Sequence, residues 1–146
     1  MSFIQSSRKI ILASASPRRR ELLSSVGIQF EVIPSSINEV QLEGERPEKF
    51  VLRMAEEKAR EVAHAHPDRI VLAADTVVVV DGKILGKPTD SADALRMLTL
   101  LQGREHSVLT AYSIVDPSRE SAVTRVVETV VRFRQLASSE IAAYAE

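Results

Sequence analysis

The stretch Leu12-Ala-Ser-Ala-Ser-Pro-Arg-Arg-Arg-Glu-Leu-Leu23 decides how this chain begins to fold. The first residues of this stretch are the last ones of an apolar run over 9–13. That run is rich in β-branched isoleucine and too short for a helix, which predicts a strand. Ser16 is a good N-cap and Pro17 a good first helical residue, because the N–H that proline lacks would be unpaired there. Gly27 ends the predicted helix. The pattern therefore indicates a strand, a tight loop and a helix N-terminus.

Three arginines, residues 18–20, lie in the first turns of this predicted helix. The helix dipole places positive charge there, so the arginines destabilise a helix that stands alone. A bound anion would reverse this effect, because backbone N–H groups, serine hydroxyls and guanidinium groups would converge on phosphate. A solvated basic turn partnered by Glu21 is the alternative, and the motif leaves both open. The stretch over 82–87 is no P-loop, because Pro88 follows where serine or threonine is needed.

Composition indicates one compact globular domain over residues 1–146. Hydrophobic residues make up 45% and charged residues 27%, which is ordinary for a soluble protein. A net charge of -1 argues against stable nucleic-acid or membrane-surface binding, and the absence of cysteine excludes disulfides and thiolate sites. The polar N-terminus lacks a signal-peptide pattern and no run is long enough to span a membrane, so we expect a cytoplasmic protein.

The remaining pattern alternates strands and helices, which predicts an α/β fold. Strands are expected over 30–33, 70–80, 83–85, 105–115 and 122–133. A polar loop over 34–46 precedes a long helix over 47–66. Asp90 or Ser91 caps a third helix that Gly103 ends, and Ser138 or Ser139 caps a last short helix.

Two charged residues stand in apolar surroundings. Lys58 falls in the middle of the apolar arc predicted for the helix over 47–66, so it either snorkels to solvent or meets an anion. Asp75 interrupts the most apolar run of the chain and needs a cation, a metal or several donors; a structural aspartate bonded to backbone N–H groups is the alternative. His64 and His66 are two residues apart, so they do not face each other on a helix and indicate a frayed helix end.

In this order, these pieces resemble the Maf family of nucleoside triphosphate pyrophosphatases. The matching stretches are residues 12–23, 37–39, 55–59, 73–77, 86–88, 100–108 and 131–136, with Ile141 and Tyr144 beyond them. The resemblance implies the α/β fold shared with inosine-triphosphate pyrophosphatases (Maf/Ham1-like). That fold has a long central mixed sheet flanked by helices, with a cleft between two lobes.

The resemblance also implies a site and a reaction. Four residues would hold the phosphates: Ser14, Ser16, Arg18 and Arg19. Glu39 and Asp75 would bind a divalent cation, Mg²⁺ or Mn²⁺, and orient or deprotonate the attacking water. Lys58 and Lys87 would neutralise charge on the phosphate chain. These residue types suit hydrolysis of a nucleoside triphosphate to the monophosphate and pyrophosphate, which needs cations beside the oxyanions and a prepared water.

Two positions resemble the branch of the family that cleaves dTTP and UTP: Arg18 directly after the proline, and Thr76 directly after Asp75. The 7-methyl-GTP branch usually has a bulky aromatic residue and a glutamine there. We therefore expect pyrimidine nucleoside triphosphates, including modified ones, as substrates. The alternative is a non-catalytic or weakly catalytic nucleotide-binding regulator of cell division, because Maf proteins are linked to inhibition of septum formation.

Family members continue past the helix that carries Tyr144 into a segment with Lys-Ala-Gly and Gly-Ile-Gln-Gly motifs, which this sequence lacks. We expect the phosphate and metal side of the site to be intact and base discrimination to be weakened. The strand over 122–133 is expected to expose an edge that such a segment would cover, which favours self-association as a homodimer.

Overall fold

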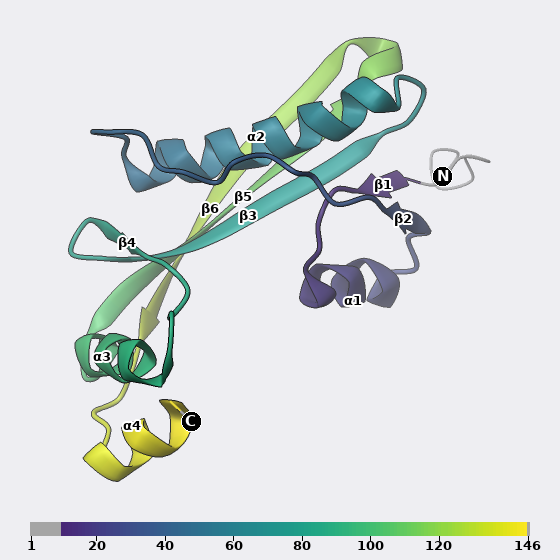
Figure 1. Ribbon diagram of the computed structural model, residues 1–146. Helices are drawn as coiled ribbons and strands as arrows, with labels where there is room; N and C mark the ends of the chain where they lie inside the picture. Colours follow the sequence, from purple (N-terminus) through teal and green to yellow (C-terminus); the bar gives the residue numbers. More distant parts are fainter. Residues whose placement is uncertain (1–9, 146) are drawn as a thin grey trace.

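The computed structural model describes residues 10–145, which form a six-stranded mixed sheet flanked by helices (Figure 1). The strands are β1 (Ile10–Leu12), β2 (Phe30–Val32), β3 (Val71–Val80), β4 (Lys83–Leu85), β5 (Glu105–Asp116) and β6 (Ser121–Arg132). The helices are α1 (Pro17–Ser25), α2 (Pro47–Ala65), α3 (Ser91–Leu101), the 3-10 helix η2 (Pro117–Arg119) and α4 (Ser138–Ala145). The expected α/β architecture with a long mixed sheet is confirmed; Lys9, where the first strand was expected to begin, lies outside the described residues.

One local prediction is wrong. Neither Ser138 nor Ser139 caps the last helix, because both lie within α4. The backbone N–H of Ala137 instead donates to the Glu140 carboxylate at 3.2 Å, and the Ala137 carbonyl accepts from the N–H of Ile141 at 3.1 Å. The Glu140 carboxylate in the first turn thus accepts a hydrogen bond from Ala137, the residue before the helix. The helix therefore begins at Ser138, one residue earlier than a cap at Ser138 would allow.

Helix α2 lies across one face of the long strands β3 and β5 and contributes residues to both hydrophobic core clusters (Figure 1). The apolar arc predicted from its periodicity is buried, and Ala63 joins it: Phe50, Val51, Met54, Ala55, Ala59, Val62 and Ala63. Against this arc pack Val71 and Ala73 of β3 near one end, and Val77 with Leu109 of β5 near the other. Burial of these side chains fixes the face of α2, and with it the direction in which Lys58 points.

The edge of β3 that faces away from β5 is divided between two short strands. Parallel β1 pairs with Val71 and Leu72, and antiparallel β4 pairs with Val78 to Val80. Among the described residues, the stretch over 73–77 has no strand neighbour on this edge, although β5 pairs along its other edge. The chain leaves β1 at this gap and enters α1, so the serine and arginine loop lies beside the middle of β3.

Strand β6 forms one outer edge of the sheet, and its side chains are mostly exposed on both faces. Val127 and Val130 are 53% and 60% exposed. The exposed edge expected from the sequence is therefore confirmed, while self-association through it stays a prediction. No helix within residues 10–145 has the length and apolar character needed to cross a membrane.

Candidate active site

The loop between β1 and α1 is built around two serine hydroxyls. Ser16 is the N-cap of α1, as predicted, and its Oγ accepts from the backbone N–H of Arg19 at 3.4 Å. Ser14 is buried, and its Oγ accepts from the N–H of Ser16 at 3.1 Å and from Nη1 of Arg19 at 3.3 Å. Pro17 starts the helix without an unpaired N–H. These bonds fix the side chain of Arg19 over the gap in the sheet.

Arg19 joins this loop to β3. Its Nη2 donates to the Thr76 hydroxyl at 2.9 Å, and that hydroxyl lies 3.1 Å from the hydroxyl of Thr110 on β5. Partial burial lowers the pKa of the Arg19 guanidinium, and the negative charges of Asp75 and Glu39 oppose that shift. A guanidinium stays protonated in spite of such a shift, so Arg19 is a fixed cation of the site.

Lys58 brings two carboxylates together. Its Nζ lies 2.5 Å from Oε1 of Glu39 and 3.1 Å from Oδ1 of Asp75. The Lys58 and Asp75 side chains are only 13% and 14% exposed, whereas Glu39 is 55% exposed. For each of these two charges the sequence left two interpretations open. In the structure, Lys58 forms ion pairs with two carboxylates instead of extending to solvent. Asp75 forms an ion pair with Lys58 instead of accepting hydrogen bonds from backbone N–H groups. Taking both charges out of water is tolerated because each compensates the other.

Hydrogen bonds and ion pairs connect seven of the nine predicted site residues into two adjoining groups: Ser14, Ser16, Arg19 and Thr76, and Glu39, Lys58 and Asp75. Arg18 and Lys87 are exposed, and their side chains make no hydrogen bond or ion pair with any described residue. Thr110 was missed by the sequence analysis. Its only sequence signal is a hydroxyl within an apolar strand, and its closeness to Thr76 depends on the β3–β5 register.

The Asp75 and Glu39 pair is the carboxylate centre of the site. Within residues 10–145 no three histidine, aspartate or glutamate side chains gather as a metal-binding group. His64 lies in the last turn of α2 and His66 is its C-cap, so both histidines lie at the helix end, as expected. Two carboxylates, Glu39 and Asp75, and two cations, Lys58 and Arg19, thus lie beside the unpaired part of the β3 edge. This arrangement suits a polyanion whose own oxygen atoms complete the coordination of a cation.

Comparison with known proteins identifies the family of this chain. The family model described as Maf-like protein matches residues 9–146. The chain belongs to the Maf-like family. Two curated relatives carry the name dTTP/UTP pyrophosphatase. The one from Geotalea uraniireducens is 50% identical over 141 residues, 97% of this chain and 73% of the relative. The one from Citrifermentans bemidjiense is 51% identical over 135 residues, 92% of this chain and 70% of the relative.

Among solved structures, the Ham1 protein of Staphylococcus aureus matches this Maf-like chain with a TM-score of 0.53. The match covers 85% of this chain and 70% of the Ham1 chain, at 18% sequence identity. At that identity the likeness concerns the fold alone, and it confirms the expected Ham1-like architecture.

Proposed function

We propose that this chain is a nucleoside triphosphate pyrophosphatase that hydrolyses dTTP and UTP to the nucleoside monophosphate and pyrophosphate. The observation that carries the proposal is the contact of Lys58 with both Glu39 and Asp75, beside Arg19 at the N-terminus of α1. Phosphoanhydride hydrolysis needs positive charge at the phosphate oxygens and a base at the attacking water, and this cluster supplies both.

The phosphate side of the site is proposed to be the loop before α1. Ser14 and Ser16 offer hydroxyls, Arg19 offers a guanidinium held in place by the Thr76 hydroxyl, and the helix N-terminus favours negative charge. Arg18 and Lys87 are exposed and have no partner among the described residues, which leaves their charges available to the triphosphate. We therefore keep both as proposed phosphate ligands.

Glu39 and Asp75 are proposed to hold a divalent cation, Mg²⁺ or Mn²⁺, and to prepare the water. Mg²⁺ is commonly held by one or two carboxylates together with substrate phosphates, so a donor set of two carboxylates fits it. When bound, the ion would act as a Lewis acid on a phosphoryl oxygen. Asp75, the less exposed carboxylate, is the proposed acceptor for the proton of the attacking water. Lys58 then offsets the charge that develops on the phosphate oxygens.

The pyrimidine preference is supported by Arg18 and Thr76 at the two branch positions and by relatives about half identical in sequence that are named dTTP/UTP pyrophosphatase. The test is a panel of canonical and modified nucleoside triphosphates with Mg²⁺ or Mn²⁺, with products separated by anion exchange. We expect dTTP and UTP to react fastest and to yield pyrophosphate, not inorganic phosphate. Faster cleavage of 7-methyl-GTP would contradict the preference, and tight binding without turnover would favour the regulatory alternative.

Arg19 and Arg18 are expected to differ in their contribution to substrate binding. Arg19→Ala should raise KM for dTTP by about 10–100-fold, because charge-assisted hydrogen bonds to phosphate are lost. Arg18→Ala should raise it less, because this exposed side chain is not held in place before substrate binds. Arg20→Ala is the matched control, since Arg20 is exposed on the same helix and is no proposed ligand. Equal effects of all three substitutions on KM would show that only the general positive charge of α1 matters.

We also propose that residues 1–146 act as one domain in the cytoplasm. The single continuous sheet supports one domain, and a nucleoside triphosphate substrate with a cysteine-free chain suits that compartment. The net charge of -1 argues against nucleic acid as a stable partner. The exposed β6 edge is the surface that we propose for a homodimer.

A further inference from the structure

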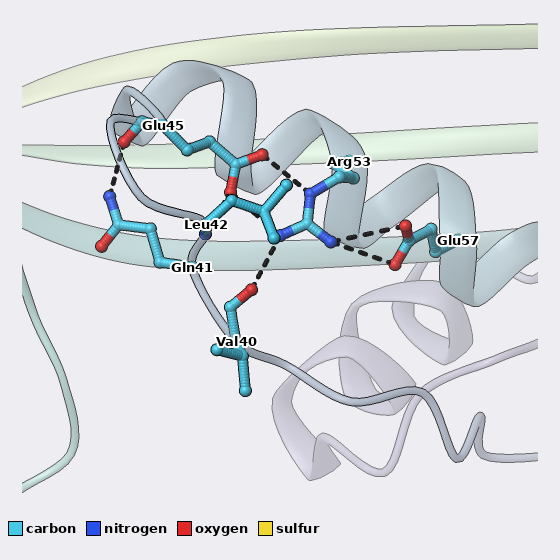
Figure 2. Close-up of polar contacts among 6 residues, drawn as sticks. All are labelled: Val40, Gln41, Leu42, Glu45, Arg53 and Glu57. Carbon is cyan, nitrogen blue, oxygen red and sulfur yellow. Dashed lines mark hydrogen bonds and ion pairs between the residues drawn. The ribbon is translucent and has the colours of Figure 1, made fainter.

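Arg53 connects α2 to the loop over 33–46, as Figure 2 shows. Its Nε and Nη2 donate to the two carboxylate oxygens of Glu45 at 2.7 and 2.9 Å, in a bidentate pair. Nη2 also donates to the backbone carbonyl of Val40 at 2.8 Å. Nη1 donates to Glu57, one helical turn further along, at 3.3 Å. One side chain therefore binds the loop at two places.

Glu45 closes the loop around this guanidinium. Its Oε1 accepts from the backbone N–H of Leu42 at 3.1 Å, and its own carbonyl accepts from the Gln41 side-chain amide at 2.7 Å. The hydrogen bond from Arg53 holds the pKa of Glu45 down to about 2, so this carboxylate is ionised throughout the neutral range. Arg53 also lies over the Phe50 ring, 5.7 Å from its centroid, which restrains the plane of the guanidinium.

This network holds the loop directly beside Glu39. Val40 is the next residue along the chain, so the bond to its carbonyl fixes the Val40–Gln41 peptide, one residue beyond Glu39. On the other side, the N–H and hydroxyl of Ser36 donate to the Glu61 carboxylate at 2.6 and 3.2 Å. Arg53 and Glu61, which make these two contacts with the loop, both lie on α2. The same helix carries Lys58, the ion-pair partner of Glu39. Glu39 thus lies between two attachments to the helix that bears its ion-pair partner.

We propose that Arg53 is a positioning residue that holds the loop on α2 so that Glu39 reaches the site; this rests on the proposed function, in which Glu39 acts. The loop over 33–46 has no helix or strand of its own, and ordering each residue costs roughly 1–2 kcal/mol of conformational entropy. Without Arg53, the 55% exposed Glu39 keeps its ion pair with Lys58 and the Ser36–Glu61 attachment before it, but loses the attachment that follows it. The role calls for arginine, because a lysine ammonium cannot make the bidentate pair and the carbonyl bond with one planar group.

The test measures dTTP hydrolysis by Arg53→Ala and Arg53→Lys, each made in the wild-type chain and in a Glu39→Gln chain. Alone, Arg53→Ala should lower kcat/KM by about 10–100-fold, the usual range for a residue that orients a metal ligand, and raise the half-saturating Mg²⁺ concentration about 10-fold. Arg53→Lys should fall between. In the Glu39→Gln chain, Arg53→Ala should lower kcat/KM by less than about 3-fold further, since the effects of substituting residues that act through one another are not additive.

Two matched controls separate the loop contacts from the rest of Arg53's surroundings. Glu57→Gln removes only the contact within the helix, and Arg60→Ala removes an exposed arginine of α2 that has no partner among the described residues. Both should keep kcat/KM within about 2-fold of wild type. A readout independent of turnover is amide hydrogen exchange, which should speed up over 39–45 in Arg53→Ala and stay unchanged over β3.

Equal losses from Arg53→Ala in both chains would overturn the proposal in favour of a general structural role. So would a lowered Tm with unchanged kcat/KM and unchanged Mg²⁺ dependence. Where Arg53→Ala fails to fold, or Glu39→Gln leaves no measurable rate, Glu45→Gln and Arg53→Lys decide: a normal Mg²⁺ dependence in both would overturn it. A wild-type chain without dTTP turnover would contradict the proposed function alone, because hydrogen exchange over 39–45 still reports whether Arg53 holds the loop.

Discussion

Replacing Asp75 by asparagine is expected to lower kcat for dTTP hydrolysis by about 10²–10⁴-fold, the range typical of a lost general base. The amide keeps the shape of the side chain on β3 but loses the charge that would hold a cation and accept the proton of water. Lys58 keeps Glu39 as a partner, so the phosphate side of the site should remain formed. The affinity for a non-hydrolysable dTTP analogue, measured by calorimetry, should therefore change by less than about 5-fold.

Glu43→Gln is the matched control for this substitution. Glu43 is an exposed carboxylate of the same loop as Glu39 and has no hydrogen bond or ion pair with any described residue. It should leave both kcat and analogue affinity at wild-type values. A near-normal kcat for Asp75→Asn would contradict the assignment of Asp75 as the base, and a matching loss of affinity would show that its charge acts in binding instead.

Replacing Lys58 by methionine is expected to reduce both activity and stability. The change keeps most of the buried stem but leaves Glu39 and Asp75 facing each other without their shared cation. Losing one partner of a fully buried ion pair costs about 3–5 kcal/mol of unfolding free energy. The residual exposure of this pair and the solvated Glu39 reduce the expected loss to about 2 kcal/mol. We expect kcat/KM for dTTP to fall by about 10²-fold or more, because the charge that offsets phosphate oxyanions is gone.

Denaturant unfolding and a dTTP assay together test this prediction. The double substitution Lys58→Met with Asp75→Asn should be more stable than Lys58→Met alone, since it removes the uncompensated carboxylate, yet it should remain inactive. Lys49→Met, on the exposed side of the first turn of α2, is the control and should change neither quantity. Unchanged stability in Lys58→Met would mean that the carboxylates are already well solvated.

Elements with local signals were predictable from the sequence. The start of α1 is marked by Ser16 and Pro17, and its end by Gly27. The turn into β4 is marked by the Asp81-Gly82 pair. The periodicity of α2 also placed Lys58 among apolar residues, which is where the structure has it.

Features that depend on long-range pairing were not predictable. Arg19, unlike its neighbour Arg18, is held in place before substrate binds because it reaches the Thr76 hydroxyl, and the β1–β3 pairing brings these two residues together. Arg53 lies on the charged side of α2, where a solvated side chain is the ordinary expectation. Its partners come from a loop that has neither helix nor strand periodicity, so no sequence pattern announces them.

The parallel pairing of β1 with β3 has a consequence for the order of folding. β5 and β6 are joined by the short η2 turn and can pair early, whereas Ile11 must find Val71 across some sixty intervening residues. Closing so long a loop is entropically slow and is deferred until nearby contacts have formed. Ser14 and Arg19 reach β3 only through that closure. The proposed phosphate side of the site is therefore assembled in the same late event that completes the sheet, and a chain that has not finished folding is expected not to bind nucleotide.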